Sequence, residues 1–298
     1  MEIQHLTHIE INRQKWDVCI QNACNSLVYA ESWYLDIVSP NWEALVVGDY
    51  EYVMPLPVKK KYGISFLVQP PLTQQLGIFS SNSIDENVVE SFIQKIPYRS
   101  YHLCFNEQNP CNKGRQLPNF ILNLDKNYQT FFAAYSKNTQ RNIKKSSSYN
   151  IVIKKGISAN DFLDFYHATE KNYIIWAEKV NKLVKVALEK DKMTIYGAYN
   201  SDDQLISALC LLHSSQRLIY WLPVSNKEGK EALAMFKIVD EMIQHHANSN
   251  LILDFEGSKI ENIARFYQGF GAEVKPYLEI KRHSVNDFLK HFYLRILN

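Results

Sequence analysis

Two carboxylates stand two positions apart in the last fifth of the chain. Asp254 and Glu256 alternate with Leu253 and Phe255 in the short segment 251–256. Since side chains in a strand alternate between its two faces, a strand here places both carboxylates on one face. A carboxylate in such a place can accept a proton from an attacking amine, directly or through water. It can equally bind a substrate ammonium, form a structural hydrogen bond or cap the next helix.

A short helix is expected directly after these carboxylates. Ser258 and Glu261 have the three-residue spacing of a capping box, in which the two side chains satisfy backbone N–H groups of the first turn. Apolar residues then recur at helical spacing as far as Tyr267, and Gly269 is placed to end the helix. We therefore expect Ser258 and Glu261 to be structural rather than catalytic.

A run of positive charge lies between residues 126 and 160. It contains seven lysines or arginines and no aspartate or glutamate. Arg141, Lys144 and Lys145 recur at helical spacing, so they share one face of a predicted helix that begins near Tyr128. Such a face can hold a phosphate-bearing ligand. It can also be a solvated surface whose charges complement the helix macrodipole.

The strands and helices that must position these residues indicate a mixed α/β fold of the α+β class. Short apolar runs bounded by turn residues predict strands at 42–47, 50–58, 64–68, 101–105, 120–124, 151–153, 193–199, 205–213, 217–222 and 251–255. Segments with a 3.6-residue apolar period predict helices between them. The helix over 232–243 is a crossover that brings strand 251–255 beside an earlier strand.

The composition is that of a globular protein. The chain has 298 residues, of which 46% are apolar and 21% charged, and this length allows one large domain or two smaller ones. The lack of a long apolar stretch and of a signal-like N-terminus predicts no membrane span and a cytoplasmic location. The net charge of +2 gives no global attraction to nucleic acid or anionic lipid. Five cysteines without a Cys-x-x-Cys pair argue against a disulfide framework and a zinc site.

The end of the chain resembles the FemAB-like aminoacyltransferases, a family within the GNAT acyltransferase superfamily. The resemblance rests on Leu253-Asp254-Phe255-Glu256-Gly257-Ser258 and on Ala264-Arg265-Phe266-Tyr267-Gln268-Gly269-Phe270-Gly271-Ala272-Glu273, which is similar to the family's DFxG…FKxxFG region. Tyr267 stands in the place of the family's usual lysine. The basic segment Asn138-Thr139-Gln140-Arg141-Asn142-Ile143-Lys144-Lys145 and the alternating N-terminal half are also similar.

The resemblance implies two tandem GNAT-like domains, each a mixed, mainly antiparallel sheet flanked by helices. We expect them over residues 1–125 and 126–298, with the candidate active site in the second. GNAT enzymes that use acyl-CoA hold its pyrophosphate on a Q/R-x-x-G-x-G/A loop. In the corresponding region only Gly229 fits that pattern, because Asn226 replaces the first residue and Glu231 the last small one.

Individual site residues also follow from the resemblance. Tyr267 stands where GNAT enzymes often place a tyrosine that protonates the leaving thiolate, and a phenol is a suitable donor for that step. It can instead be a buried aromatic residue of the helix. Tyr220 and Trp221 are candidates for lining a substrate channel, although core packing is the alternative for both. The full set of substrate-binding candidates is Arg141, Lys144, Lys145, Tyr220, Trp221, Ser225, Asn226, Gly229 and Arg265.

These interpretations lead to one main function. We expect a transferase that moves an acyl or aminoacyl group from an activated donor to an amine acceptor, either a small molecule or a peptide. Asp254 or Glu256 would assist deprotonation of the amine, and Tyr267 would assist the leaving group. The resemblance implies cell-wall precursor metabolism as the setting, with aminoacyl-tRNA or acyl-CoA as co-substrate. Neither a tightly bound cofactor nor a metal is expected.

Two alternatives remain open from the sequence. One is an acyl-CoA-dependent N-acyltransferase outside cell-wall metabolism. The other is a non-catalytic module that holds RNA on the surface between Lys126 and Lys155, because this part of the chain carries the local excess of positive charge.

Overall fold

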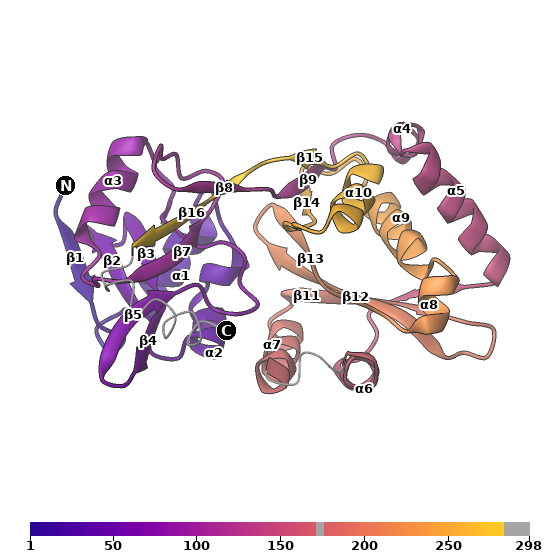
Figure 1. The fold of residues 1–298 in the computed structure, drawn as a ribbon, viewed down its shortest axis with the longest axis horizontal. Helices are drawn as coiled ribbons and strands as arrows, with labels where there is room; N and C mark the ends of the chain where they lie inside the picture. Colours follow the sequence, from indigo (N-terminus) through magenta and orange to yellow (C-terminus); the bar gives the residue numbers. More distant parts are fainter. Residues whose placement is uncertain (171–175, 283–298) are drawn as a thin grey trace, which may run out of the picture. The chain divides into compact units, whose positions relative to one another are not determined.

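The chain folds into two units of mixed α/β structure (Figure 1). The computed structural model describes residues 1–170 and 176–282. Unit 1 comprises residues 1–117 and the segment that begins at 276, and unit 2 comprises residues 118–275. This division differs from the expected one after residue 125. Strand β9 (Phe120–Asn123) pairs with a strand of unit 2, and strand β16 (Tyr277–Arg282) returns to the sheet of unit 1.

Unit 1 contains two sheets. The first has the order β1-β2-β3-β6, with β1 at Ile3–Leu6, β2 at Glu43–Val47, β3 at Tyr52–Leu56 and β6 at Phe79–Ser80. The second has the order β4-β5-β7-β16-β8, with β4 at Val58–Lys61, β5 at Ile64–Val68, β7 at Tyr101–Phe105 and β8 at Arg115–Leu117. The helical elements are α1 (Arg13–Asn22), η1 (Val28–Ala30), α2 (Ser32–Val38) and α3 (Glu86–Lys95).

Both sheets of unit 1 share one hydrophobic core with α3. Val89 and Phe92 of α3 are fully buried in the cluster that also holds residues of β2, β3, β5, β7 and β16. Helix α3 begins at Glu86, because the side chain of Asp85 accepts a hydrogen bond from the N–H of Val88 and caps the first turn. The strands predicted at 42–47 and 50–58 form an antiparallel hairpin, β2 and β3, and Gly48 supplies a positive φ of 57° in its turn.

Unit 2 is built on a seven-stranded sheet with the order β10-β11-β12-β13-β14-β9-β15. Its strands are β9, β10 (Val152–Lys155), β11 (Met193–Tyr199), β12 (Leu205–Ser214), β13 (Arg217–Ser225), β14 (Ile252–Asp254) and β15 (Glu273–Val274). Only β13 and β14 run parallel among these pairs. The expected crossover and the expected mixed, mainly antiparallel sheet are therefore confirmed.

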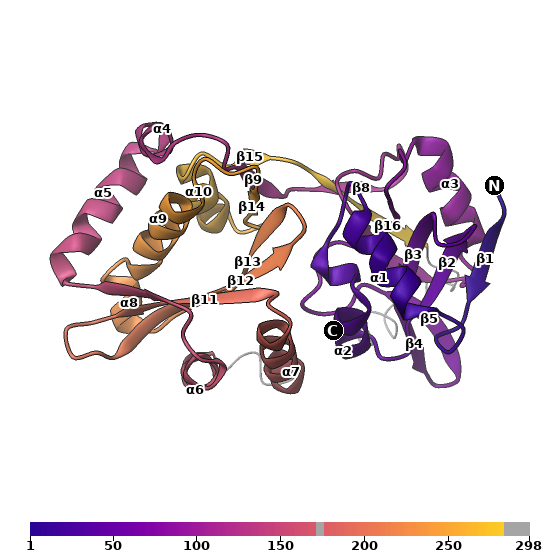
Figure 2. The same ribbon diagram turned by 180° about the vertical axis from the view of Figure 1, so that it is seen from behind.

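Helices cover both faces of this sheet. They are α4 (Tyr128–Ala134), α5 (Lys137–Ser146), α6 (Ala159–Thr169), α7 (Ala177–Glu189), α8 (Lys227–Glu231), α9 (Ala234–His246) and α10 (Glu261–Gly269), with the short η2 at Ser147–Tyr149. Figures 1 and 2 show α6 and α7 on one face, and α5 and α9 on the other. The second face buries a cluster rich in aromatic residues, which includes Phe255, Tyr267 and Phe270.

One helix predicted from the sequence is two helices, α4 and α5, in the structure. The predicted helix that begins near Tyr128 ends at Ala134, and Tyr135 is extended with a ψ of 145°. The side chain of Ser136 then accepts a hydrogen bond from the N–H of Thr139 and caps the new helix α5. The aromatic residues Tyr128, Phe131 and Phe132 and the basic residues of α5 therefore belong to different helices, because a serine that prefers the cap position lies between them.

Candidate functional site

The site lies where β13 and β14 separate. The two strands pair only over Arg217–Ile219 and Ile252–Asp254, and β13 continues to Ser225. Beyond the paired part there is a pocket of about 340 Å³. We call it the apolar pocket, since most of the side chains that line it are apolar. They are Tyr220, Pro223, Ser225, Gly229, Lys230, Leu233, Met235, Phe236, Asn262, Ile263, Phe266 and Tyr267.

A β-bulge in β13 decides which side chains face this pocket. Leu209 of β12 opposes Pro223 and Cys210 opposes Trp221, so Leu222 is an extra residue without an opposite partner. Its φ of 48° marks the local distortion. A bulge shifts the alternation of side chains by one residue. The pocket is therefore lined by positions 220, 223 and 225 of β13 rather than by 220, 222 and 224.

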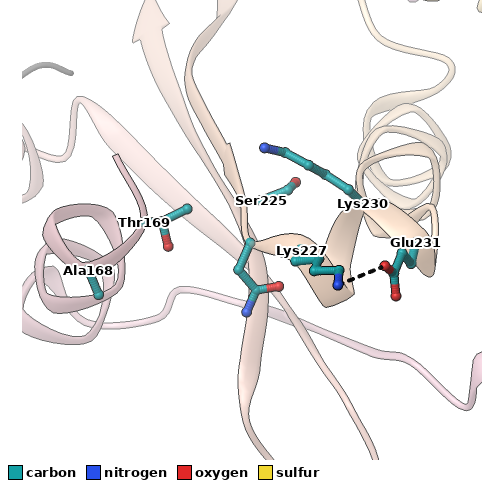
Figure 3. Close-up of a pocket in the computed structure, with 7 residues that line it drawn as sticks. Ala168, Thr169, Ser225, Lys227, Lys230 and Glu231 are labelled. Atoms are coloured by element: carbon teal, nitrogen blue, oxygen red, sulfur yellow. Dashed lines mark ion pairs between the residues drawn. The ribbon is translucent and has the colours of Figure 1, made fainter. Parts of the chain in front are cut away.

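A second, polar pocket adjoins the first. It has a volume of about 530 Å³ and shares Ser225 and Lys230 with the apolar pocket. Figure 3 shows Thr169 of α6 on one side of it, and Ser225, Lys227 and Lys230 on the other. Lys227 and Glu231 approach to 4.0 Å as an exposed pair. A donor with a charged carrier and an apolar group could occupy both pockets at once.

Two neighbouring tyrosines are part of the apolar pocket lining. The rings of Tyr220 and Tyr267 are 5.7 Å apart, and the ring of Tyr267 stacks on Phe255 at 5.0 Å. Burial raises the pKa of Tyr267, and the charges of Glu256 and Asp254 raise it further. Burial also raises the pKa of Tyr220 well above its usual value. Both phenols therefore remain protonated at neutral pH, which is the state that a proton donor needs.

Asp254 is held in a buried ion pair. Its side chain is 3% exposed, and Oδ2 lies 2.6 Å from Nη1 of Arg217, whose side chain is 9% exposed. Its Oδ1 accepts a hydrogen bond of 2.8 Å from the N–H of Glu256. Asp254 is not among the residues that line the two pockets. The geometry gives Asp254 a structural contact on each oxygen, which the sequence analysis considered as the alternative to catalysis.

Glu256 differs from Asp254 in its environment. It follows the end of β14, is half-buried, and has a φ of 62°, which is uncommon for a residue with a side chain. The hydrogen bond from its N–H to Asp254 fixes this left-handed turn. Its charge is close enough to Tyr267 to contribute to the raised pKa of that phenol. Of the two carboxylates, Glu256 is the one within reach of water.

Gly229 has a packing role that the sequence did not indicate. The side chain of Asn226 accepts a hydrogen bond of 2.8 Å from the N–H of Gly229 and so caps α8. A Cβ at position 229 would lie 2.1 Å from the carbonyl oxygen of Ile206. The helix can approach β12 this closely only with glycine. Together these contacts set the position of the pocket wall formed by α8.

Several other candidates lie away from the pockets. Trp221 is buried, with 2% of its surface exposed, and is not among the lining residues. Arg141, Lys144 and Lys145 are exposed on α5. Arg265 is also exposed, and its Nη2 lies 2.6 Å from Glu261 of the preceding turn. The structure therefore brings together Tyr220, Ser225, Asn226, Gly229 and Tyr267 around the pockets.

The predicted capping box is wrong. Helix α10 begins at Glu261, and its N-cap residue, Ile260, makes no side-chain cap. The hydroxyl of Ser258 instead accepts a hydrogen bond of 3.1 Å from the N–H of Ile260. The left-handed turn at Glu256 and the irregular residues after it delay the helix start to Glu261. The predicted end of the helix at Gly269 is correct.

Most residues of the apolar pocket wall were not predicted from the sequence as site residues. Leu233, Met235 and Phe236 all fall within the single helix predicted over 232–243. In the structure Leu233 has a φ of 57° and separates α8 from α9, so side chains at the start of α9 face the pocket. Arg217 was missed because its partner Asp254 lies 37 residues further along the chain.

Comparisons with known proteins identify the fold. No protein-family profile and no curated protein sequence matches the chain. Among solved structures, FemX is similar with a TM-score of 0.66 and 9% identity, and the match covers 100% of both chains. The C-terminal domain of a putative lysylphosphatidylglycerol synthetase from Agrobacterium fabrum matches with a TM-score of 0.60 and 5% identity, over 96% of each chain. L-PGS from Bacillus licheniformis matches with a TM-score of 0.56 and 7% identity, over 95% of this chain and 96% of that one.

Within the described residues, none of the helices is both long and apolar enough to cross a bilayer. The same residues contain no group of three or more histidine, cysteine, aspartate or glutamate side chains that could hold a metal ion.

Proposed function

We propose that the protein, which has the fold of FemX along its whole length, transfers an acyl or aminoacyl group from an activated donor to an amine. The observation that carries this proposal is the pair of adjoining pockets at the point where β13 and β14 separate. One is polar and carries lysines, and the other is apolar with two protonated phenols in its lining. These pockets suit the carrier and the transferred group of one donor. The acceptor is a small molecule or a peptide.

Tyr267, which lines the apolar pocket, and Glu256, whose charge acts on that phenol from outside the lining, can perform the two proton transfers that the reaction needs. The amine nitrogen forms a bond to the acyl carbon while the bond from that carbon to the carrier oxygen or sulfur breaks. Glu256 accepts the proton that the amine loses, and the hydroxyl of Tyr267 gives a proton to the leaving atom. The raised pKa of Tyr267 keeps this proton in place until the leaving group acquires negative charge.

Other residues position the donor. Lys227 and Lys230 offer positive charge to a phosphate-bearing carrier in the polar pocket. Ser225 stands between the two pockets, where a hydroxyl can hydrogen-bond the donor at the junction of carrier and acyl group. Asn226 and Gly229 set the position of α8. We propose aminoacyl-tRNA as the donor, in keeping with the family resemblance.

The Tyr267→Phe variant tests this mechanism. We expect kcat to fall by about 100-fold or more, the usual contribution of a positioned proton donor, with little change in KM for the donor. Transfer from aminoacyl-tRNA to a panel of amines is followed by mass spectrometry. The matched control is Tyr196→Phe, which removes the hydroxyl of another buried tyrosine outside the pocket lining and should leave kcat unchanged. A Tyr267→Phe enzyme with full activity would remove Tyr267 from the mechanism.

A second donor is favoured by the lining of the apolar pocket, which contains no carboxylate. An aminoacyl group brings an ammonium that needs a counter-charge, whereas a plain acyl group does not. Acyl-CoA is therefore the alternative donor, and the protein would then be an N-acyltransferase. Thermal shift separates the two donors, because a ligand at 100 times its Kd adds about 2.7 kcal/mol of stability. Stabilisation and transfer with acyl-CoA alone would establish the alternative.

A further inference from the structure

The exposed side of α5 carries four cations, which we call the basic face. Lys137, Arg141, Lys144 and Lys145 are all exposed. No acidic residue occurs between positions 126 and 160, and no ion pair to these four is found among the described residues. Arg141 hydrogen-bonds the neutral side chain of Asn138. The basic face therefore presents uncompensated positive charge along about 12 Å of helix.

The opposite side of α5 is already occupied. Thr139, Ile143 and Ser146 are buried, and the helix packs on α9. Helices that bind a membrane surface do so with an apolar side that enters the lipid. The apolar side of α5 is inside the protein, so the helix offers only polar and basic groups to a partner. This arrangement favours a hydrophilic polyanion over a lipid surface.

Features around α5 favour RNA among the polyanions. Cations spaced along two helical turns can contact successive phosphates of a nucleic acid backbone. Tyr149, at the end of the η2 turn that follows α5, is 42% exposed. An exposed aromatic ring beside basic residues can stack on an unpaired base. The basic face and Tyr149 thus combine the two contacts that single-stranded or looped RNA uses.

The basic face is joined directly to the wall of the apolar pocket. The N–H of Ser136, which caps α5, donates a hydrogen bond of 2.9 Å to the carbonyl oxygen of Gly269 at the end of α10. A Cβ on Gly269 would lie 2.4 Å from Oγ1 of Thr139, so the two helices are in close contact. Helix α10 supplies Tyr267 to the pocket. A ligand on α5 is therefore held in a fixed relation to the group that reacts with the donor.

We propose that the basic face of α5 docks the phosphate backbone of an RNA, and that this RNA carries the transferred group into the apolar pocket. The inference rests on the proposed function with aminoacyl-tRNA as the donor. It adds a docking surface outside the pockets, which governs affinity for the carrier and not the chemical step.

The test uses the Arg141→Glu/Lys144→Glu double variant and deacylated tRNA. Four phosphate contacts predict an affinity loss of about 100-fold between 50 and 200 mM salt, and two contacts predict about 10-fold. The double variant should therefore bind more weakly at 100 mM salt and show a salt exponent smaller by about 2. Fluorescence anisotropy measures both quantities. The matched control is Lys59→Glu/Lys60→Glu, which reverses two exposed lysines on β4 of unit 1 and should bind as the wild type does.

A kinetic measurement separates docking from catalysis. With aminoacyl-tRNA the double variant should show a KM about 10-fold higher and an unchanged kcat, whereas transfer from a 3′-aminoacyl adenosine should be unaffected. Equal tRNA binding by variant and wild type overturns the proposal, as does binding to phosphatidylglycerol vesicles in place of RNA. If the variant loses tRNA binding and no donor supports transfer, the docking surface stands and the proposed function fails.

Discussion

The buried pair of Arg217 and Asp254 allows a quantitative prediction. The Asp254→Ala substitution leaves the guanidinium of Arg217 in the interior without this carboxylate, and removal of one partner of a buried ion pair costs about 3–5 kcal/mol. The N–H of Glu256 also loses its acceptor, which adds about 1 kcal/mol. We therefore expect the free energy of unfolding of unit 2 to fall by about 4–6 kcal/mol.

Calorimetry of the purified variant measures this loss. For a unit of this size a loss of 1 kcal/mol lowers Tm by about 2–4 °C, so the transition of unit 2 should move down by about 10–20 °C. The double variant Arg217→Met/Asp254→Leu replaces the pair by apolar side chains of similar volume. It should unfold close to the wild-type temperature, because such replacements of buried ion pairs are often neutral or stabilising.

Two results would contradict this reasoning. One is a Tm for Asp254→Ala within 2 °C of the wild-type value, which would mean that the pair is accessible to water. The other is a stable double variant that binds its donor normally but has lost transfer by about 1,000-fold. That outcome would show that the Arg217–Asp254 pair takes part in the reaction and is more than a structural contact.

Two further predictions concern the interior of unit 2. Burial raises the pKa of Asp240 to about 6, while Tyr128 donates hydrogen bonds to both of its oxygens. Because the folded pKa of Asp240 lies above the unfolded one, this carboxyl lowers the free energy of unfolding by about 2 kcal/mol as pH rises from about 4 to 6. The Asp240→Asn variant should lack this pH-dependent loss, which urea titrations at several pH values measure. A Gly229→Ala variant should lose about 1–3 kcal/mol by calorimetry, since its Cβ would overlap the carbonyl oxygen of Ile206. An unchanged Tm would show that α8 can move away from β12 without cost.

Local sequence patterns predicted most elements of the fold. The strand, crossover helix and parallel strand from β13 to β14 were predicted because each has its own clear period and turn residues. The errors lie where two local signals compete. Ser136 interrupts an otherwise continuous helical pattern, and Ser258 has the spacing of a cap that the left-handed turn at Glu256 displaces. Cap positions depend on backbone angles that spacing alone does not determine.

The site was harder to predict than the fold because it depends on contacts between distant segments. Tyr220 and Tyr267 were chosen from their positions in a strand and a motif, and both face the apolar pocket. The partner of Asp254 could not be predicted, since nothing near residue 217 marks it as the neighbour of residue 254. The bulge at Leu222 was equally hidden, because leucine has no preference for a positive φ.

The path of the chain through its two units has a consequence for biosynthesis. Strand β16 lies between β7 and β8 in the second sheet of unit 1, yet it comes after all of unit 2 in the sequence. On the ribosome, residues 1–117 of unit 1 therefore emerge first but wait for an interior strand that is made after unit 2. Unit 2 has its seven strands by residue 274 and can form its sheet without that strand. The second unit can thus complete its folding before the first, and a nascent chain that stops short of β16 leaves the edges of β7 and β8 open to aggregation.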